Sequence, residues 1–167
     1  SVPIFYADIE AKKLYSKLDI KKKVKDIFGE SVFENDIISF KKLAAIVFKD
    51  TELLKKLEGI VYPYLLNIFF SWVEFHKDTD YVMMENAVLF EKGFDKYFDK
   101  IITVKCPKDI RFERIAEREN ISIDEIADRE KIQWDEKEKT SRSHFVINNY
   151  GQEPILPQIV EIDKCLR

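Results

Sequence analysis

The sequence predicts an α/β fold with a parallel sheet and a helical insertion. Short apolar runs alternate with amphipathic helical segments, which is typical of parallel strands joined by helices. Residues 18–80 have a helical pattern instead, so we expect a helical lobe to interrupt the sheet. Each expected strand ends in polar residues, and in open α/β sheets ligands bind at the carboxyl ends of the strands.

The composition is that of one domain with a core, because 46% of the 167 residues are hydrophobic. The net charge is −3 with both signs interleaved, which argues against a nucleic-acid or membrane-surface protein. Cys106 and Cys165 have neither metal-ligand spacing nor the density of a disulfide framework, and no long apolar run is present. We therefore expect a reduced, cytoplasmic protein with no membrane and no nucleic acid among its partners.

The first expected strand, residues 3–6, ends just before Asp8. A helix over residues 9–15 should follow, which places Asp8 at the end of the strand and at the N-cap of the helix. Capping alone would account for an aspartate there. The same place also suits a catalytic carboxylate, so both interpretations stay open.

The helical lobe should contain several short helices. The apolar spacing indicates a helix that ends at Gly29, a turn-rich stretch over residues 30–38, a helix near residues 40–48 and another that starts at Asp50. We expect Pro63 to break this last helix and to open a new one, residues 64–76. The many aromatic side chains of that segment indicate a core helix.

The second half of the chain returns to alternating strands and helices. Ser122 and Glu125 have the spacing of a capping box, which predicts a helix start there. Pro107 should lie in the first turn of the preceding helix. Strands are expected over residues 80–86, 100–106 and 144–149, and helices over residues 111–119, 122–133, 135–143 and 155–166.

Arginines recur at helical spacing around a break at Asn120. Arg111, Arg114 and Arg118 share one side of the first helix, and Arg129 lies on the second. Guanidinium groups bind two phosphate oxygens at once, so a helical hairpin carrying them could clamp a phosphorylated ligand. The alternative is that these arginines pair with neighbouring carboxylates on solvated helix faces.

Six motifs follow one another at compatible spacing. They are Y-A-D-I-E-A at residues 6–11, K-K-L-A-A-I-V-F at 41–48 with Tyr62 and Pro63 behind it, E-N-A-V-L-F-E-K-G at 85–93, R-I-A-E-R-E at 114–119, the pair Arg129 and Gln133, and V-I-N-N-Y-G at 146–151. In this order they resemble the dephospho-CoA kinase family, P-loop kinases of the nucleoside and nucleotide kinase type. The resemblance covers essentially the whole chain.

The resemblance implies a reaction and a fold. The family transfers the γ-phosphoryl group of ATP, with Mg2+, to the 3′-hydroxyl of dephospho-CoA, the last step of coenzyme A synthesis. Its three-layer P-loop kinase fold has a parallel sheet, a helical substrate-binding lobe and a helical lid. Here the core would be residues 1–17, 81–118 and 137–167, the dephospho-CoA-binding lobe residues 18–80, and the lid residues 119–136.

The resemblance also implies roles for individual residues. Asp8 would orient or deprotonate the 3′-hydroxyl, and Glu85 would face Mg2+ through water. The arginines Arg114, Arg118 and Arg129 would close on the phosphates as the lid and its base, the first two being catalytic, and Asn149 and Gly151 would lie beside the adenine of ATP. Arg111 has no position in the motifs, so we expect it on the solvated face. The role of Arg142 is open between ligand contact and helix capping.

The sequence departs from the family pattern in several places. The four glycines are too widely spaced for a P-loop, so the P-loop strand, which is central in this fold, is absent from the 167 residues. We expect that segment to precede Ser1 in a longer protein; without it, two neighbouring strands would lack their partner, and ATP binding and kinase activity should be missing. The single-residue departures are Tyr62 for His, Glu85 for Asp and His144 for a common Asp, with smaller ones at Tyr6, Ala87 and Glu119.

Two alternatives stay open on the sequence alone. The protein could be another small-molecule kinase of the same fold, acting on a nucleoside or nucleotide. It could also be a non-catalytic relative without a P-loop that serves as a binding protein. We expect a monomer or a small homo-oligomer.

Overall fold

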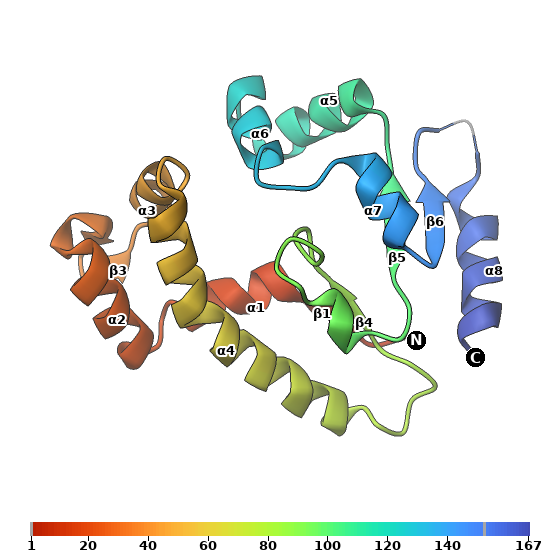
Figure 1. The fold of residues 1–167 in the computed structure, drawn as a ribbon, viewed down its shortest axis with the longest axis horizontal. Coiled ribbons are helices and arrows are strands. Elements are labelled where there is room, and N and C mark those ends of the chain that lie inside the picture. Colours follow the sequence, from red (N-terminus) through yellow and green to blue (C-terminus); the bar gives the residue numbers. More distant parts are fainter. Residues whose placement is uncertain (1, 152) are drawn as a thin grey trace. The chain divides into compact units, whose positions relative to one another are not determined.

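The computed structural model describes residues 2–151 and 153–167 (Figure 1). Its strands form two parallel pairs and one short antiparallel hairpin. The chain divides into unit 1, which ends at Asn86, and unit 2, Ala87–Arg167. Unit 1 contains β1 (Ile4–Tyr6), α1 (Ala7–Leu14), α2 (Leu18–Phe28), β2 (Phe33–Glu34), β3 (Ile37–Ile38), α3 (Phe40–Val47), α4 (Thr51–Phe75) and β4 (Met83–Glu85). Unit 2 contains β5 (Ile102–Lys105), α5 (Lys108–Glu119), α6 (Ile123–Glu130), α7 (Glu136–Arg142), β6 (Phe145–Asn148) and α8 (Ile155–Leu166).

In unit 1, β1 and β4 pair in parallel, as predicted, with Tyr6 opposite Glu85. Phe5, the middle residue of β1, is 3% exposed and lies edge-on to two rings of α4, at 5.2 Å from Phe69 and 5.5 Å from Trp72. The predicted core role of the aromatic residues on this helix is confirmed for Phe69, which is buried, but is wrong for Phe70 and Phe75, which are 46% and 82% exposed. The rings in contact with Phe5 attach the strand pair to the helical layer.

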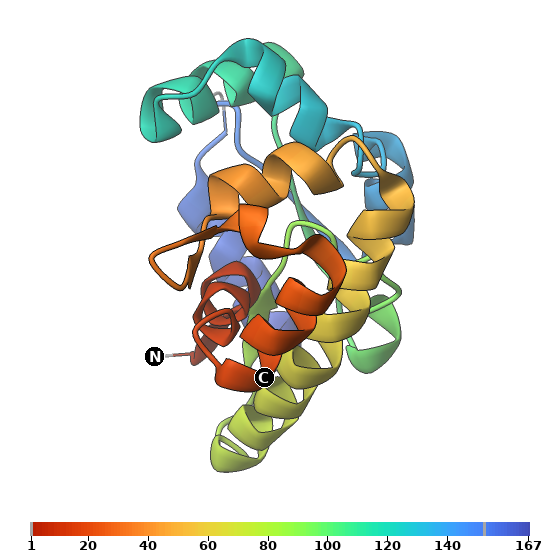
Figure 2. The same cartoon turned by 90° about the vertical axis from the view of Figure 1, so that its left-hand side faces the viewer.

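Helix α4 is the central helix of unit 1, and α1, α2 and α3 all pack on it (Figure 2). The predicted break at Pro63 is wrong, because α4 runs through it. Buried side chains repeat every four residues on both sides of the proline: Leu57, Val61, Leu65 and Phe69. Burying each of them stabilises the fold by about 1.5–3 kcal/mol, which together exceeds the roughly 3 kcal/mol that an interior proline costs. The apolar stripe therefore decides the length of the helix.

A short hairpin lies within the predicted turn-rich stretch, residues 30–38; the turn was expected, but its two strands were not. Strands β2 and β3 are antiparallel and are joined by Asn35 and Asp36, whose φ angles are 49° and 60°. Two successive positive φ values define a type I′ turn, and Asn and Asp accept that conformation more readily than other side chains. Each strand has only two residues, too few to produce an alternating pattern.

We predict that Gly59→Ala stabilises the chain. Gly59 lies inside α4, and a Cβ atom built there would meet nothing within 4 Å. Alanine should raise the free energy of unfolding by about 0.5–1 kcal/mol, because glycine loses more backbone entropy in a helix. Urea unfolding measures the change. Gly29→Ala is the control: Gly29 has φ +73°, so alanine should destabilise the chain there. Lower stability of Gly59→Ala would contradict the account of α4.

In unit 2, β5 and β6 pair in parallel from Ile102 opposite Phe145 to Lys105 opposite Asn148. Helix α8 is fixed to the end of β6 by one side chain. Gln158 Oε1 accepts the N–H of Asn148 at 2.8 Å, and Gln158 Nε2 donates to the carbonyl of Asn148 at 3.2 Å.

Among the described residues, no helix combines the length and the apolar character needed to cross a membrane.

Helices α5 and α6 form the predicted hairpin around Asn120. Asn120 is left-handed with φ 51°, which ends α5 and turns the chain. Ser122 accepts the N–H of Glu125, and Glu125 accepts the N–H of Ser122, so the predicted capping box is confirmed. Pro107 is the N-cap residue of α5 and not part of its first turn.

Candidate functional site

Two carboxylates lie at the carboxyl edge of the parallel pair in unit 1. Glu85 is the last residue of β4 and stands opposite Tyr6, and Asp8 follows Tyr6 by two residues. Both residues are exposed. The parallel register therefore brings the two predicted acidic residues to one edge, where ligands of α/β proteins bind.

The predicted capping role of Asp8 is wrong. Tyr6 is the N-cap residue of α1, no side chain caps this helix, and Asp8 lies in its first turn. Strand β1 continues directly into α1, so the helix begins two residues earlier than expected. The favourable field of the helix N-terminus still acts on the Asp8 carboxylate. With capping removed as an explanation, Asp8 is an exposed carboxylate at the strand edge.

Two tyrosines of unit 1 lie near Glu58, and one of them, Tyr62, also interacts with Asp8; neither had a predicted function. Burial, then the charges of Glu58, Tyr15 and Asp8, raise the pKa of Tyr62. Burial and Glu58 raise the pKa of Tyr15 to about 12. Both phenols are therefore neutral at pH 7 and can donate hydrogen bonds. The only hint in the sequence was that Tyr62 replaces the family's His. That departure did not predict that Tyr62, on α4, interacts with Asp8, on α1.

In unit 2, the structure brings Arg114 and Asn149 together. Arg114 Nη1 donates to the main-chain oxygen of Asn149 at 2.9 Å and to its Oδ1 at 3.2 Å. Arg114 comes from the middle of α5, and Asn149 directly follows β6. Two residues predicted to contact ATP thus meet at the carboxyl end of the β5–β6 pair. Gly151, with φ 85°, lies in the exposed turn that follows.

The other two predicted arginines meet at one carboxylate. Glu119 accepts from Arg118 Nη2 at 2.7 Å and from Arg129 Nη1 at 2.6 Å, which joins the end of α5 to α6. Arg118 and Arg129 thus form the ion pairs that the alternative interpretation expected. They also remain together at the joint of the hairpin, within reach of an incoming anion, because their side chains are 72% and 47% exposed.

We predict that Glu119 titrates below the ordinary range of a glutamate. Hydrogen bonds from Arg118 and then Arg129 lower the pKa of this carboxyl. The pairing therefore stabilises the hairpin above the unfolded-state pKa of about 4.3, and this contribution is lost as the pH falls through the lowered folded-state value. Carbon-13 NMR of the side-chain carboxyl measures it. Arg129→Gln should raise the pKa and Lys131→Gln should leave it; ordinary titration in the unchanged chain would contradict the bridge.

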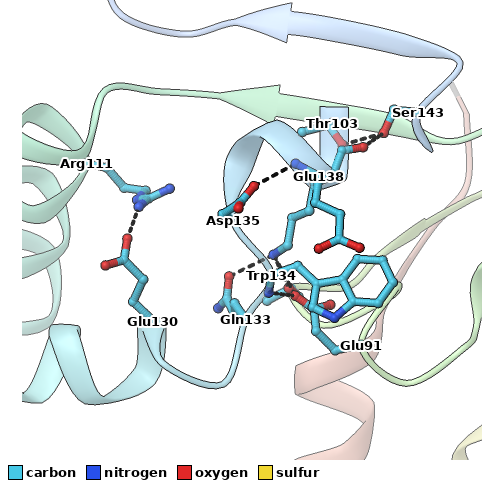
Figure 3. A network of polar contacts seen from close by, with 11 residues as sticks. Glu91, Thr103, Arg111, Glu130, Gln133, Trp134, Asp135, Glu138 and Ser143 are labelled. Atoms are coloured by element: carbon cyan, nitrogen blue, oxygen red, sulfur yellow. Dashed lines mark hydrogen bonds and ion pairs between the residues drawn. The ribbon is translucent and has the colours of Figure 1, made fainter. Parts of the chain in front are cut away.

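Arg111 and Arg142 have other partners. Arg111 pairs with Glu130 across the α5–α6 hairpin and is only partly exposed, so the expected solvated position is half right (Figure 3). Arg142 lies 4.6 Å from the centre of the Trp134 ring and 3.4 Å from Glu138. A guanidinium over an indole is a stabilising cation–π contact. Both arginines are thus engaged within unit 2.

The oxygen ligands of unit 1 fit Mg2+ better than a transition metal. Within residues 2–151 and 153–167 no group of three or more His, Cys, Asp and Glu side chains could hold a metal ion. Asp8 and Glu85 are two hard oxygen ligands at one edge. Mg2+ keeps several waters and binds to one or two carboxylates together with substrate phosphates, so the chemistry of these two side chains is compatible with Mg2+.

Comparison with known proteins adds three findings. The family model described as CoaE, dephospho-CoA kinase, matches residues 1–154. The dephospho-CoA kinase of Bacteroides fragilis strain ATCC 25285 is 36% identical over 163 residues, which cover 96% of this chain and 79% of that protein. The crystal structure of TT1252 from Thermus thermophilus has a TM-score of 0.85 at 27% identity and covers 99% of this chain and 84% of its own.

A further solved structure, the dephospho-CoA kinase from Campylobacter jejuni, has a TM-score of 0.66 over 98% of this chain and 84% of its own. At 23% identity it supports the fold alone. The fold prediction is thereby confirmed. Since the family model matches most of the chain and a relative of that name exceeds 30% identity over most of its length, the chain belongs to the dephospho-CoA kinase family.

Proposed function

We propose that this protein transfers the γ-phosphoryl group of ATP to the 3′-hydroxyl of dephospho-CoA, giving coenzyme A and ADP. The observation that carries the proposal is the family match over residues 1–154. The pair of carboxylates at the edge of β1 and β4 supports it, since a kinase needs an acceptor for the hydroxyl proton. We place the reaction in the cytoplasm.

Asp8 has the central role in the proposed mechanism. Its carboxylate accepts a hydrogen bond from the 3′-hydroxyl and holds the oxygen in line with the γ-phosphorus. As the new O–P bond forms, the bond to ADP breaks and the hydroxyl proton passes to Asp8. Alignment contributes more to phosphoryl transfer than basicity does, so a carboxylate of ordinary strength suffices.

The arginines of unit 2 supply positive charge in this proposal. Arg114 and Arg118 neutralise charge on the transferring phosphoryl group, and Arg129 closes on the phosphates with the lid. Asn149 and Gly151 lie beside the adenine. When nucleotide binds, Glu119 exchanges its two guanidinium partners for solvent as the phosphates take its place.

Mg2+ supplies positive charge to the phosphates of ATP when it is bound. Glu85 would hold its waters from the end of β4, next to Asp8. A glutamate reaches about one methylene further than the aspartate of the family pattern, which suits contact through water. The helical lobe, residues 18–80, receives dephospho-CoA in this proposal, and residues 119–136 form the lid.

A coupled assay of ADP release tests the proposal in the full-length protein. We expect release with dephospho-CoA and ATP–Mg2+, and much less with nucleosides or nucleoside monophosphates. Preference for a nucleoside or its monophosphate would replace the proposed substrate. Calorimetry tests the non-catalytic alternative, since a scaffold should not bind ATP–Mg2+ at micromolar concentration. Sedimentation of the same sample determines whether the protein is a monomer or a small homo-oligomer.

A further inference from the structure

A buried ion pair in unit 2 lies outside the residues assigned above. The Glu91 side chain is 5% exposed and the Lys139 side chain 17%, and Glu91 Oε1 lies 3.0 Å from Lys139 Nζ. Neither residue had a role predicted from the sequence. Buried charges require specific partners, so this pair fixes the segments that carry it.

The pair connects three segments of the chain. Lys139, on α7, donates to the carbonyl of Ala87 at 3.3 Å and to Gln133 Oε1 at 3.0 Å. Glu91 Oε1 also accepts the main-chain N–H of Trp134 at 2.6 Å (Figure 3). With Glu91 as its third neighbour, the ammonium group has one oxygen for each of its three donors. We call Glu91, Gln133, Trp134 and Lys139 the lid anchor.

Aromatic contacts reinforce the anchor. Phe90, which is buried, stacks on Trp134 with ring centres 5.8 Å apart and planes 7° from parallel. Arg142 lies over the Trp134 ring. Trp134 is thus held in two ways. Glu91 accepts a hydrogen bond from its main chain, and Phe90 and Arg142 contact its ring.

The anchored residues lie just beyond Arg129. Main-chain hydrogen bonds from Lys131 to Ala127 and from Gln133 to Glu130 continue the turn of α6 to Gln133. Gln133 is therefore attached to the end of α6, and its position bears on where the Arg129 guanidinium can reach.

The carboxylate of Glu91 is only half used. Both of its contacts converge on Oε1, while Oε2 is buried and has no hydrogen-bond partner among the described residues. A buried oxygen without a donor is unfavourable and uncommon in folded proteins. A small shift that moves Lys139 onto Oε2 would satisfy it while Trp134 stays on Oε1.

We propose that Glu91 is a positioning residue for phosphoryl transfer: with Lys139 it fixes the point at which the lid, residues 119–136, joins α7, and so directs Arg129. This inference rests on the proposed function. Glu91 itself touches no substrate. Its loss should make lid closure less favourable, which affects kcat and the KM for ATP together and leaves the KM for dephospho-CoA unchanged.

Glu91→Gln in the full-length protein tests the proposal, because glutamine keeps an acceptor for Trp134 N–H and removes the charge that holds Lys139. We expect kcat to fall by about tenfold and the KM for ATP to rise several-fold. Lys139→Gln should give the same losses, and the double variant should be no worse than either single variant, because both remove one interaction. Asp128→Asn is the matched control, since it removes an exposed lid ion pair with Lys131.

If the ion pair is merely structural, its loss should lower the melting temperature only. At temperatures well below melting, kcat and the KM for ATP would then stay within twofold of those of the unchanged enzyme, and this result would overturn the proposal. Losses that multiply in the double variant would also overturn it. If Glu91→Gln does not fold, Lys139→Gln decides by the same kinetics. If the unchanged enzyme releases no ADP with dephospho-CoA, the proposed function fails instead. Amide exchange then tests the anchor alone: Glu91→Ala should expose the Trp134 amide, and retained protection would contradict the contact.

Discussion

Asp8→Asn in the full-length protein is expected to reduce kcat by about 10²–10⁴-fold with a modest change in ATP affinity. Asparagine keeps the shape of the side chain but cannot take the proton of the 3′-hydroxyl. Its amide would also present a donor where the hydroxyl needs an acceptor. Steady-state kinetics with dephospho-CoA gives kcat, and calorimetry with ATP–Mg2+ gives the affinity.

Glu10→Gln is the matched control for this variant. Glu10 lies two residues further along the same helix and forms an exposed ion pair with Lys13 at 2.6 Å. Its replacement removes one negative charge from α1 without touching the strand edge, so turnover should stay within twofold of the unchanged enzyme. Near-normal turnover of Asp8→Asn would exclude the proposed role of Asp8, and an equal loss in Glu10→Gln would point to the charge of α1 instead.

Arg114→Met is expected to reduce kcat by about 10²–10³-fold, because a preorganised positive charge is lost where negative charge develops. The variant also removes the donor that holds both oxygens of Asn149, so the KM for ATP should rise as well. Arg114→Lys should recover part of kcat, since it keeps the charge without the planar donor fork.

Arg111→Gln provides the comparison within the same helix. Arg111 lies one turn before Arg114 and pairs with Glu130, whereas Arg114 donates to Asn149. We expect a small loss of stability and normal turnover. If Arg111→Gln and Arg114→Met lose turnover equally, the effect comes from α5 as a whole and not from one guanidinium.

Local patterns predicted the elements of this fold well where one principle dominated. The parallel pairing of both strand pairs, the N-cap at Asp50 and the capping box at Ser122 are all present. The errors occurred where two principles compete. Pro63 is a helix breaker, but the side chains that pack on both sides of it are far apart in the sequence, so their combined burial could not be weighed in advance.

The candidate site was predictable where a local motif defined a residue, and unpredictable where a contact depends on residues far apart in the sequence. The motifs located Arg114 and Asn149, and the structure joins them by hydrogen bonds. The bridging of Arg118 and Arg129 by Glu119 depends on the sharp turn at Asn120, which the sequence predicted only as a break. Glu91 was located in the motif at 85–93, but its pairing was not predicted, because a glutamate in an apolar run does not reveal a lysine that lies 48 residues further along the chain.

The contact between Gln158 and Asn148 has a consequence for the end of the chain. The side-chain amide of Gln158 both accepts from and donates to the main chain of Asn148, as the backbone of a neighbouring strand would. Helix α8 therefore satisfies the main-chain groups at the end of β6. Glutamate at position 158 could accept but not donate, and leucine could do neither. The strand end that leads into Asn149 therefore owes its order to a helix that begins at Ile155, just beyond the segment shared with the family model.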